Sequence, residues 1–162
     1  MPTLTTRLYV ARHATAEDAS ADGFDHARRL TKKGRKAFAR LLRRLAEAGM
    51  EVDLVATSPL VRARETAEIL AAELDVPRVE VVDMLAPAAD WQALVEWTVR
   101  QDAARVAWVG HAPCVGRLVA LSIGDGSAGI RMHKGAVAAI RLDDGPGQPG
   151  ELDWLATPDL VG

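Results

Sequence analysis

Short apolar segments rich in β-branched residues alternate along the chain with longer segments of helical periodicity. The six expected strands are residues 7–11, 53–57, 79–82, 105–110, 136–142 and 151–156. The four expected helices are residues 31–48, 60–74, 91–100 and 113–123. Strands that alternate with helices usually pair in parallel and are covered on both faces. The pattern therefore predicts an α/β protein, a three-layer α/β/α sandwich with a mainly parallel, about six-stranded central sheet.

The first two helices have apolar residues spaced three or four positions apart, which is the spacing of one buried helix face. In the first helix, this face is expected to consist of Ala37, Leu41, Leu45 and Ala48. In the second helix, it is expected to consist of Leu60, Ala63, Ala67, Leu70 and Leu74.

Length and charge narrow the class of protein further. At 162 residues and 49% hydrophobic, the chain is long enough for the core of one ordinary domain, so residues 1–162 are expected to form a single domain. A net charge of -2 and a pI near 6.1 give no pull toward nucleic acid, and the longest apolar runs are too short to span a membrane. Without a signal peptide, and with only Cys114, the chain is expected to be cytoplasmic.

Polar residues follow three of the expected strands directly. Arg12 and His13 follow the first strand, Ser58 and Arg62 follow the second, and His111 follows the fourth. In an open α/β sheet, ligands bind at the edge where the parallel strands end. We therefore expect these side chains to gather in one site.

Two of these junctions have the features of a helix start. Ser58 is a good N-cap residue, and Pro59 and Pro113 suit the first helical position. Backbone N–H groups at helix starts, here around Ser58 and Ala112, favour anions. Arg62 would lie in the first turn of its helix with its guanidinium aimed back toward the strand ends.

Two arginines, two histidines and two helix N-termini at one edge describe a site for a dianionic tetrahedral oxyanion, which we interpret as phosphate. An imidazole held among cations tends toward its neutral form, which leaves a ring nitrogen free to attack phosphorus. A single Arg-His pair after a strand is usually only a surface feature. The interpretation depends on the joint placement of these residues after three separate strands.

Other phosphate and metal chemistries fit the sequence less well. The spacing of Cys114 and Arg117 is too short for a cysteine-phosphatase loop, and the sequence has no GxxxxGK[ST] phosphate loop. The four histidines show no metal-ligand spacing, so neither a metal nor a cofactor is expected. His26 and His133 are expected in loops, with His133 near the rim of the pocket. The nine basic residues of segment 28–44 are expected on a solvated helix face, where they would attract an acidic partner if they border the site.

Five motifs together span nearly the whole chain: VARHA (10–14), RRLTKKG (28–34), TSPLVRARETA (57–67), VGHAPCVGRL (109–118) and HKGAVAAIRL (133–142). In these motifs the sequence resembles the histidine phosphatase superfamily, also called the phosphoglycerate mutase-like family. It is most similar to the small bacterial SixA-type phosphohistidine phosphatases. The resemblance implies that His13 is the phosphorylated nucleophile, that Arg12 and Arg62 clamp the phosphoryl oxygens, and that His111 completes the phosphate pocket.

The sequence departs from the pattern of this family at two points. Ala14 stands where the motif usually has glycine, a change small enough that we expect the site to survive it. Larger members carry a glutamate general acid in an inserted region that this chain lacks. Asp83 falls near the equivalent strand end and is the candidate general acid, with turn capping as the alternative role.

The sequence thus predicts a metal-independent phosphatase that works through a phosphohistidine intermediate and acts on phosphohistidine of a partner protein. The alternatives are a phosphatase for small phosphate esters, such as sugar phosphates or nucleotides, and a non-catalytic phosphate-binding module. The presence of both histidines argues against the binding module, because binding alone would not require them.

Overall fold

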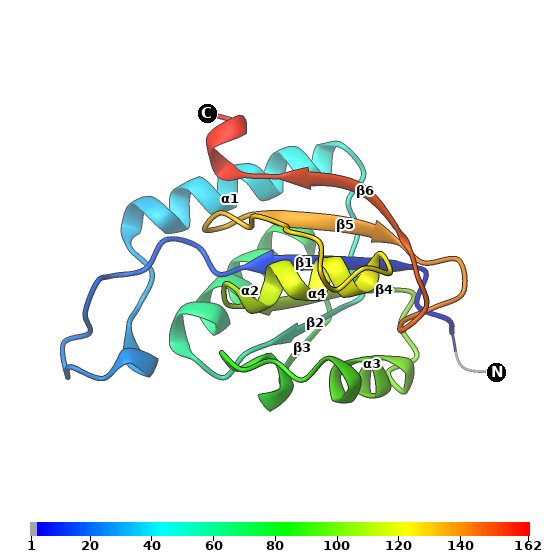
Figure 1. Ribbon diagram of the computed structural model, residues 1–162. Coiled ribbons are helices and arrows are strands. Elements are labelled where there is room, and N and C mark those ends of the chain that lie inside the picture. Colours follow the sequence, from blue (N-terminus) through cyan, green and yellow to red (C-terminus); the bar gives the residue numbers. More distant parts are fainter. Residues whose placement is uncertain (1–2) are drawn as a thin grey trace.

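The computed structural model describes residues 3–162 and contains one six-stranded sheet (Figure 1). Its strands are β1 (Arg7–Arg12), β2 (Leu54–Thr57), β3 (Arg78–Val81), β4 (Arg105–Gly110), β5 (Val137–Arg141) and β6 (Glu151–Ala156). Their order across the sheet is β3-β2-β4-β1-β5-β6. All six strands expected from the sequence are present.

The sheet is mixed. β3, β2, β4 and β1 are parallel to one another, whereas β5 runs antiparallel to both β1 and β6. The parallel part arises because each of these strands is connected to the next through a helix, and β5 and β6 form a hairpin across the glycine- and proline-rich segment 143–150. The expected mainly parallel sheet therefore describes four strands, with an antiparallel hairpin added at one edge.

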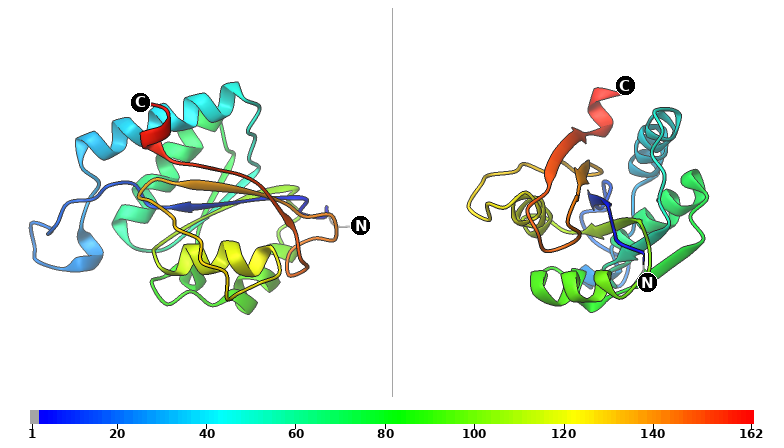
Figure 2. Two further views of the ribbon diagram at one scale, coloured as in Figure 1. Left: turned by 45° about the horizontal axis from the view of Figure 1, so that its top comes forward. Right: turned by 90° about the vertical axis from the view of Figure 1, so that its right-hand side faces the viewer.

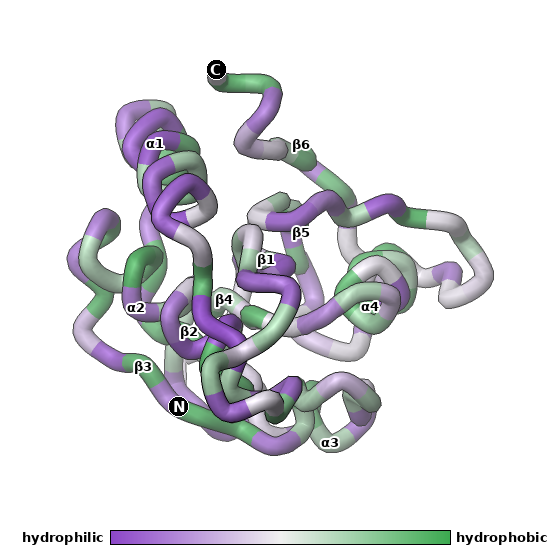
Figure 3. The backbone as a smooth tube through the Cα atoms, turned by 90° about the vertical axis from the view of Figure 1, so that its left-hand side faces the viewer, coloured by the Kyte–Doolittle hydropathy of each residue, from purple (hydrophilic) through white to green (hydrophobic). Residues whose placement is uncertain are grey.

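Four helices cover the two faces of the sheet: α1 (Lys32–Glu47), α2 (Val61–Leu74), α3 (Trp91–Val99) and α4 (Cys114–Ser122). α1 and α2 lie against one face, and α3 and α4 lie against the other (Figure 3). Three short 3₁₀ turns complete the fold: η1 (Asp25–Ala27), η2 (Asp83–Leu85) and η3 (Pro158–Leu160). The expected three-layer α/β/α sandwich is confirmed.

Both faces of the central strands are buried, because helices cover both sides of the sheet. In β1, Tyr9 and Ala11 pack into the core on the α1 and α2 side, and Leu8 and Val10 pack into the core on the opposite side. This explains why the central strands read as continuous apolar runs rather than as alternating patterns. None of the helices formed by residues 3–162 has the length and apolar character needed to cross a bilayer.

The buried face of α1 differs from the face expected from its sequence. Leu41 and Leu45 are buried as expected, but Ala37 is only half-buried and Ala48 is exposed. Phe38 and Leu42 are fully buried in their place. The helix is rotated so that its largest apolar side chains enter the core, which removes more apolar surface from water than burying two alanines would.

A glycine sets how closely α1 approaches the loop after β1, which comprises residues 13–31. A Cβ added at Gly34 would lie 2.3 Å from the main-chain oxygen of Thr15, so only glycine fits there without moving the backbone. Thr31 caps the helix with a side-chain hydrogen bond from Gly34 N–H, at 2.9 Å. The loop projects beyond the end of β1, as Figures 1 and 2 show, and its anchored end holds α1 beside this edge of the sheet.

Candidate active site

The register between β1 and β4 brings the two candidate histidines together. Arg12 is paired with Gly110 in the parallel ladder, so His13 and His111 both come one residue after the same pair. The main-chain N–H of His13 donates to the oxygen of Gly110 at 3.0 Å, and the two imidazole rings lie 5.3 Å apart between centroids. The predicted convergence of the two histidines at this sheet edge is observed.

The tautomer of His13 follows from its single hydrogen bond. His13 is 6% exposed, and its ring Nδ1 lies 2.7 Å from the main-chain oxygen of Ala14. A carbonyl oxygen has no hydrogen to donate, so the hydrogen belongs to Nδ1. The lone pair is therefore on Nε2, which makes no hydrogen bond within residues 3–162. A ring nitrogen in this state can act as a nucleophile.

Ser58 contacts His111 instead of capping a helix. Its Oγ lies 2.7 Å from His111 Nε2 and accepts a hydrogen bond from the Leu60 N–H at 3.2 Å. α2 begins only at Val61, and its N-cap Leu60 makes no side-chain cap bond. The prediction that Ser58 is the N-cap of this helix was wrong, because the helix begins only at Val61 and the Ser58 hydroxyl bonds both to Leu60 N–H and to the buried imidazole of His111.

The two candidate arginines are held from opposite sides of the site. Arg62 lies in the first turn of α2, as predicted, and is 5% exposed. Its Nη1 donates to the main-chain oxygen of Asp25 at 3.0 Å, and its Nη2 lies 3.3 Å from the Asp25 carboxylate. Arg12 donates through Nη1 to the main-chain oxygen of Met132 at 3.1 Å. Thr66 links the first turn of α2 to the residues that follow β1. Its Oγ1 accepts a hydrogen bond from Ala14 N–H at 3.0 Å and donates one to the main-chain oxygen of Arg62 at 2.7 Å.

Three buried nitrogens of these residues have no hydrogen-bond partner in the described part of the chain: Arg12 Nε, Arg62 Nε and His111 Nδ1. Leaving a buried polar group unpaired costs about 1–3 kcal/mol, and more for a charged group. Three such groups on residues that also influence one another electrostatically are difficult to explain by packing. The two arginine Nε–H groups are donors that an oxyanion would satisfy, and His111 Nδ1 is a third donor in the tautomer in which the Ser58 hydroxyl donates to His111 Nε2.

Sequence reasoning missed Asp25 and Arg28 as parts of this site. The Asp25 carboxylate contacts Arg62 and also accepts from Arg28 Nε at 2.9 Å. These two cations, Arg62 first, lower the pKa of Asp25. The sequence places Arg28 in a basic segment and at the start of the RRLTKKG motif without indicating a role for its side chain, and Asp25 lies in a loop without periodicity. The signal available for Arg28 was its place in the RRLTKKG motif, whereas Asp25 gave none.

The remaining sequence-predicted residues lie around this centre. Ala112 is exposed between His111 and the start of α4. Ala14 is buried with an ordinary negative φ, so its methyl group is accommodated where the family pattern has glycine. Asp83 begins η2 beyond the end of β3, the edge strand, with an exposed side chain. None of the hydrogen bonds found within residues 3–162 joins the Asp83 side chain to either histidine, and its role as the general acid stays a prediction.

Burial and charge keep both imidazoles neutral. The pKa of His13 is lowered to about 3, mainly by burial; the hydrogen bond to the Ala14 oxygen opposes this shift, and His111, Arg62 and Arg12 add to it. Burial likewise lowers the pKa of His111 to about 4, with Arg62 as the next contribution. At neutral pH, Nε2 of His13 is therefore unprotonated.

Titration followed by NMR should show these neutral imidazoles directly. As the pH falls from 7 to 5, the ring proton signals of His13 and His111 should stay at their neutral positions, because their pKa values are about 3 and 4. The unfolded chain binds these protons near pH 6.5, so the free energy of unfolding should decrease as the pH falls below that value. Inorganic phosphate should raise both pKa values. A midpoint near 6.5 for His13 in the free protein would contradict this account.

A neutral histidine beside two arginines that each keep an unpaired Nε–H, at the carboxyl edge of an α/β sheet, is an arrangement suited to phosphoryl transfer. The chain belongs to the histidine phosphatase superfamily. The model of branch 1 of this superfamily matches residues 8–118, a range that includes both site histidines and both site arginines.

Two curated relatives extend the likeness over most of the chain. The phosphohistidine phosphatase SixA of Escherichia coli (strain K12) is 28% identical over 157 residues, which cover 94% of each protein. An uncharacterized protein of Picosynechococcus sp. (strain PCC 7002) is 35% identical over 138 residues, which cover 83% of this chain and 84% of that protein.

Solved structures have the same fold. The protein histidine phosphatase SixA complexed with tungstate matches with a TM-score of 0.81 and 30% identity, covering 96% of this chain and 99% of that one. A putative alpha-ribazole-5'-P phosphatase from Escherichia coli K-12 matches with a TM-score of 0.71 at 21% identity, covering 95% and 98% of the two chains, which is a likeness of fold. Family membership and the similarity to SixA support phosphatase activity for this chain.

Proposed function

We propose that the protein is a metal-independent phosphatase that removes the phosphoryl group from phosphohistidine of a partner protein through a covalent intermediate on His13. The observation that carries this proposal is the neutral His13, with its Nε2 free, among the unpaired buried nitrogens of Arg12, Arg62 and His111. A binding module would need the donors but not a nucleophile with a lowered pKa.

The proposed reaction has two steps. In the first, Nε2 of His13 attacks phosphorus, a P–N bond forms, and the bond from phosphorus to the imidazole of the substrate breaks. The leaving imidazole takes a proton, ultimately from water. In the second step, water attacks the phosphoryl group on His13, which yields inorganic phosphate and the free imidazole. The arginines stabilise the charge that develops on the phosphoryl oxygens in both steps.

The choice of phosphohistidine rests on the leaving group. An alkoxide is strongly basic, so hydrolysis of an ordinary phosphate ester at neutral pH benefits greatly from a placed general acid. Asp83 is exposed at the sheet edge, and the pKa of the nearer Asp25 is lowered, which makes Asp25 a poor proton donor at pH 7. An imidazole has a conjugate-acid pKa of about 6.5 and departs with far less help.

A comparison of substrates tests this proposal. In the presence of excess EDTA, kcat/KM should be at least tenfold higher on a phosphohistidine-bearing peptide than on sugar phosphates or nucleotides. Asp83→Asn should leave this preference unchanged. If a small ester is preferred tenfold or more, and Asp83→Asn selectively destroys the activity on that ester, then Asp83 is the general acid and the protein is a small-ester phosphatase. Activity that EDTA removes and Mg²⁺ or Zn²⁺ restores would contradict the metal-independent mechanism.

A further inference from the structure

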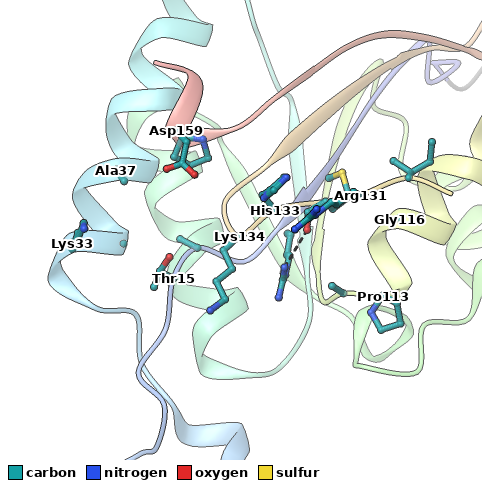
Figure 4. A pocket seen from close by; sticks show the side chains of 16 residues that line it. Thr15, Lys33, Ala37, Pro113, Gly116, Arg131, His133, Lys134 and Asp159 are labelled. Atoms are coloured by element: carbon teal, nitrogen blue, oxygen red, sulfur yellow. Dashed lines mark hydrogen bonds between the residues drawn. The ribbon is translucent and has the colours of Figure 1, made fainter. Parts of the chain in front are cut away.

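A groove of about 660 Å³ opens beside the phosphate pocket and shares Arg12 and Ala14 with it. One wall is α1, with Lys33 and Ala37, and the opposite wall is the start of α4, with Pro113 and Gly116 (Figure 4). Thr15 and Lys134 lie between these walls. The lining of the groove includes Arg12 but not His13, His111 or Arg62.

The lining of the groove is strongly basic. Lys33, Arg131, His133 and Lys134 are all exposed along it, and Asp159 is its one acidic residue. Within residues 3–162, none of the ion pairs involves Lys33, Arg131 or Lys134, although most arginines elsewhere on the surface are paired with carboxylates. Unpaired cations around a concave surface produce a positive potential that attracts anions.

The positive surface continues beyond the groove along α1. Lys32, Lys33 and Lys36 line a neighbouring hollow along the same helix, together with Ala37 and Arg40. Lys32 and Lys36 are about one helical turn apart. Across the groove, Arg131 and Lys134 of the segment before β5 add further positive charge. The charged region is thus wider than a second phosphate on a small molecule would require.

We propose that this groove, with Lys33 and Lys134 on its two sides, is the docking surface for an acidic face of the protein substrate. The proposal rests on the proposed function, because it assigns the partner chemistry of the same site. The phosphohistidine would enter the pocket at His13 while carboxylates that flank it on the partner lie along the groove. Long, exposed lysines suit a protein surface that arrives by electrostatic attraction better than a small ligand that must be enclosed.

The test compares two peptides that carry one phosphohistidine, one flanked by Asp and Glu and the other by Asn and Gln. For the wild type at low salt, kcat/KM should be at least tenfold higher on the acidic peptide, and added NaCl should reduce this preference. The paired substitution Lys33→Glu and Lys134→Glu should abolish the preference. The control double variant, Arg44→Glu and Arg100→Glu, makes the same change in net charge at exposed positions near the opposite ends of the strands. It should keep the preference for the acidic peptide.

Direct binding separates failure of this proposal from failure of the proposed function. If neither peptide is hydrolysed, the phosphohistidine assignment fails, and fluorescence anisotropy with the labelled, unphosphorylated peptides then tests the groove alone. The docking surface would be supported if the wild type binds the acidic peptide more tightly than the neutral one, and if this preference is lost in the Lys33→Glu and Lys134→Glu double variant but kept in the control double variant. The docking proposal would be overturned if the wild type binds both peptides equally, or if the Lys33→Glu and Lys134→Glu double variant keeps the preference for the acidic peptide. It would also be overturned if the double variant loses more kcat/KM on a small substrate with a second phosphate than on the acidic peptide.

Discussion

His13→Ala should abolish both turnover and formation of a phosphoenzyme. Nε2 of His13 is unprotonated and makes no hydrogen bond within residues 3–162, as the proposed nucleophile requires, whereas His111 Nε2 is bonded to Ser58. A wild-type protein treated with a phosphorylated donor should therefore carry an acid-labile, base-stable label that the variant lacks. Single-turnover labelling followed by phosphopeptide mapping would place this label on His13.

The matched control is His26→Ala, which removes an exposed imidazole from the loop before α1 and should retain activity and labelling. Thermal unfolding of both variants separates loss of chemistry from loss of structure. The covalent mechanism would have to be abandoned if folded His13→Ala protein hydrolysed substrate at the wild-type rate. Label on another residue of the wild type would have the same consequence.

Arg62→Ala should lower kcat/KM by roughly 10² to 10⁴. A preorganised cation at the transferring phosphoryl group typically supplies about 3 to 5 kcal/mol of transition-state stabilisation. Arg62 is buried with its Nε unpaired, so its charge is already in place before substrate arrives. Arg62→Lys should recover only part of the activity, because a lysine lacks the planar, two-pronged donor geometry.

Arg64→Ala is the control for Arg62, since Arg64 lies on the same helix two residues further on and is exposed. Its substitution should change kcat/KM by less than twofold. Loss of Arg62 also frees the Asp25 carboxylate, but its side chain is 68% exposed, so water can solvate it and the fold should survive. Unchanged activity of Arg62→Ala would mean that this guanidinium does not face the reacting group.

The fold was predictable because its signals are local. Strand and helix periodicities depend on neighbours a few residues away, and they located all six strands and four helices to within a few residues. The rotation of α1 was missed because Ala37 and Phe38 are both apolar and occupy neighbouring positions on the helix. Only the size of the space against the sheet decides which of them is buried.

The site was predictable to the extent that the sheet determines it. His13, His111 and Arg62 directly follow strands or begin a helix, so topology alone brings them to one edge. The partner of Ser58 was not predictable, because the choice between capping a helix and bonding His111 depends on a residue 53 positions away. Asp25 was missed for a similar reason, since its contact with Arg62 is created by the path of an irregular loop.

The pairing of Arg12 with Gly110 has a consequence for how the chain tolerates insertions and deletions. One residue added within either strand would displace its histidine by about 3.3 Å relative to the other and would turn every side chain beyond the insertion to the opposite face. Residues added to the loop at 18–24, or to the hairpin connection at 143–150, would leave the ladder intact. Variation in length is therefore expected in connections such as these two, whereas β1 and β4 should vary in sequence but not in length.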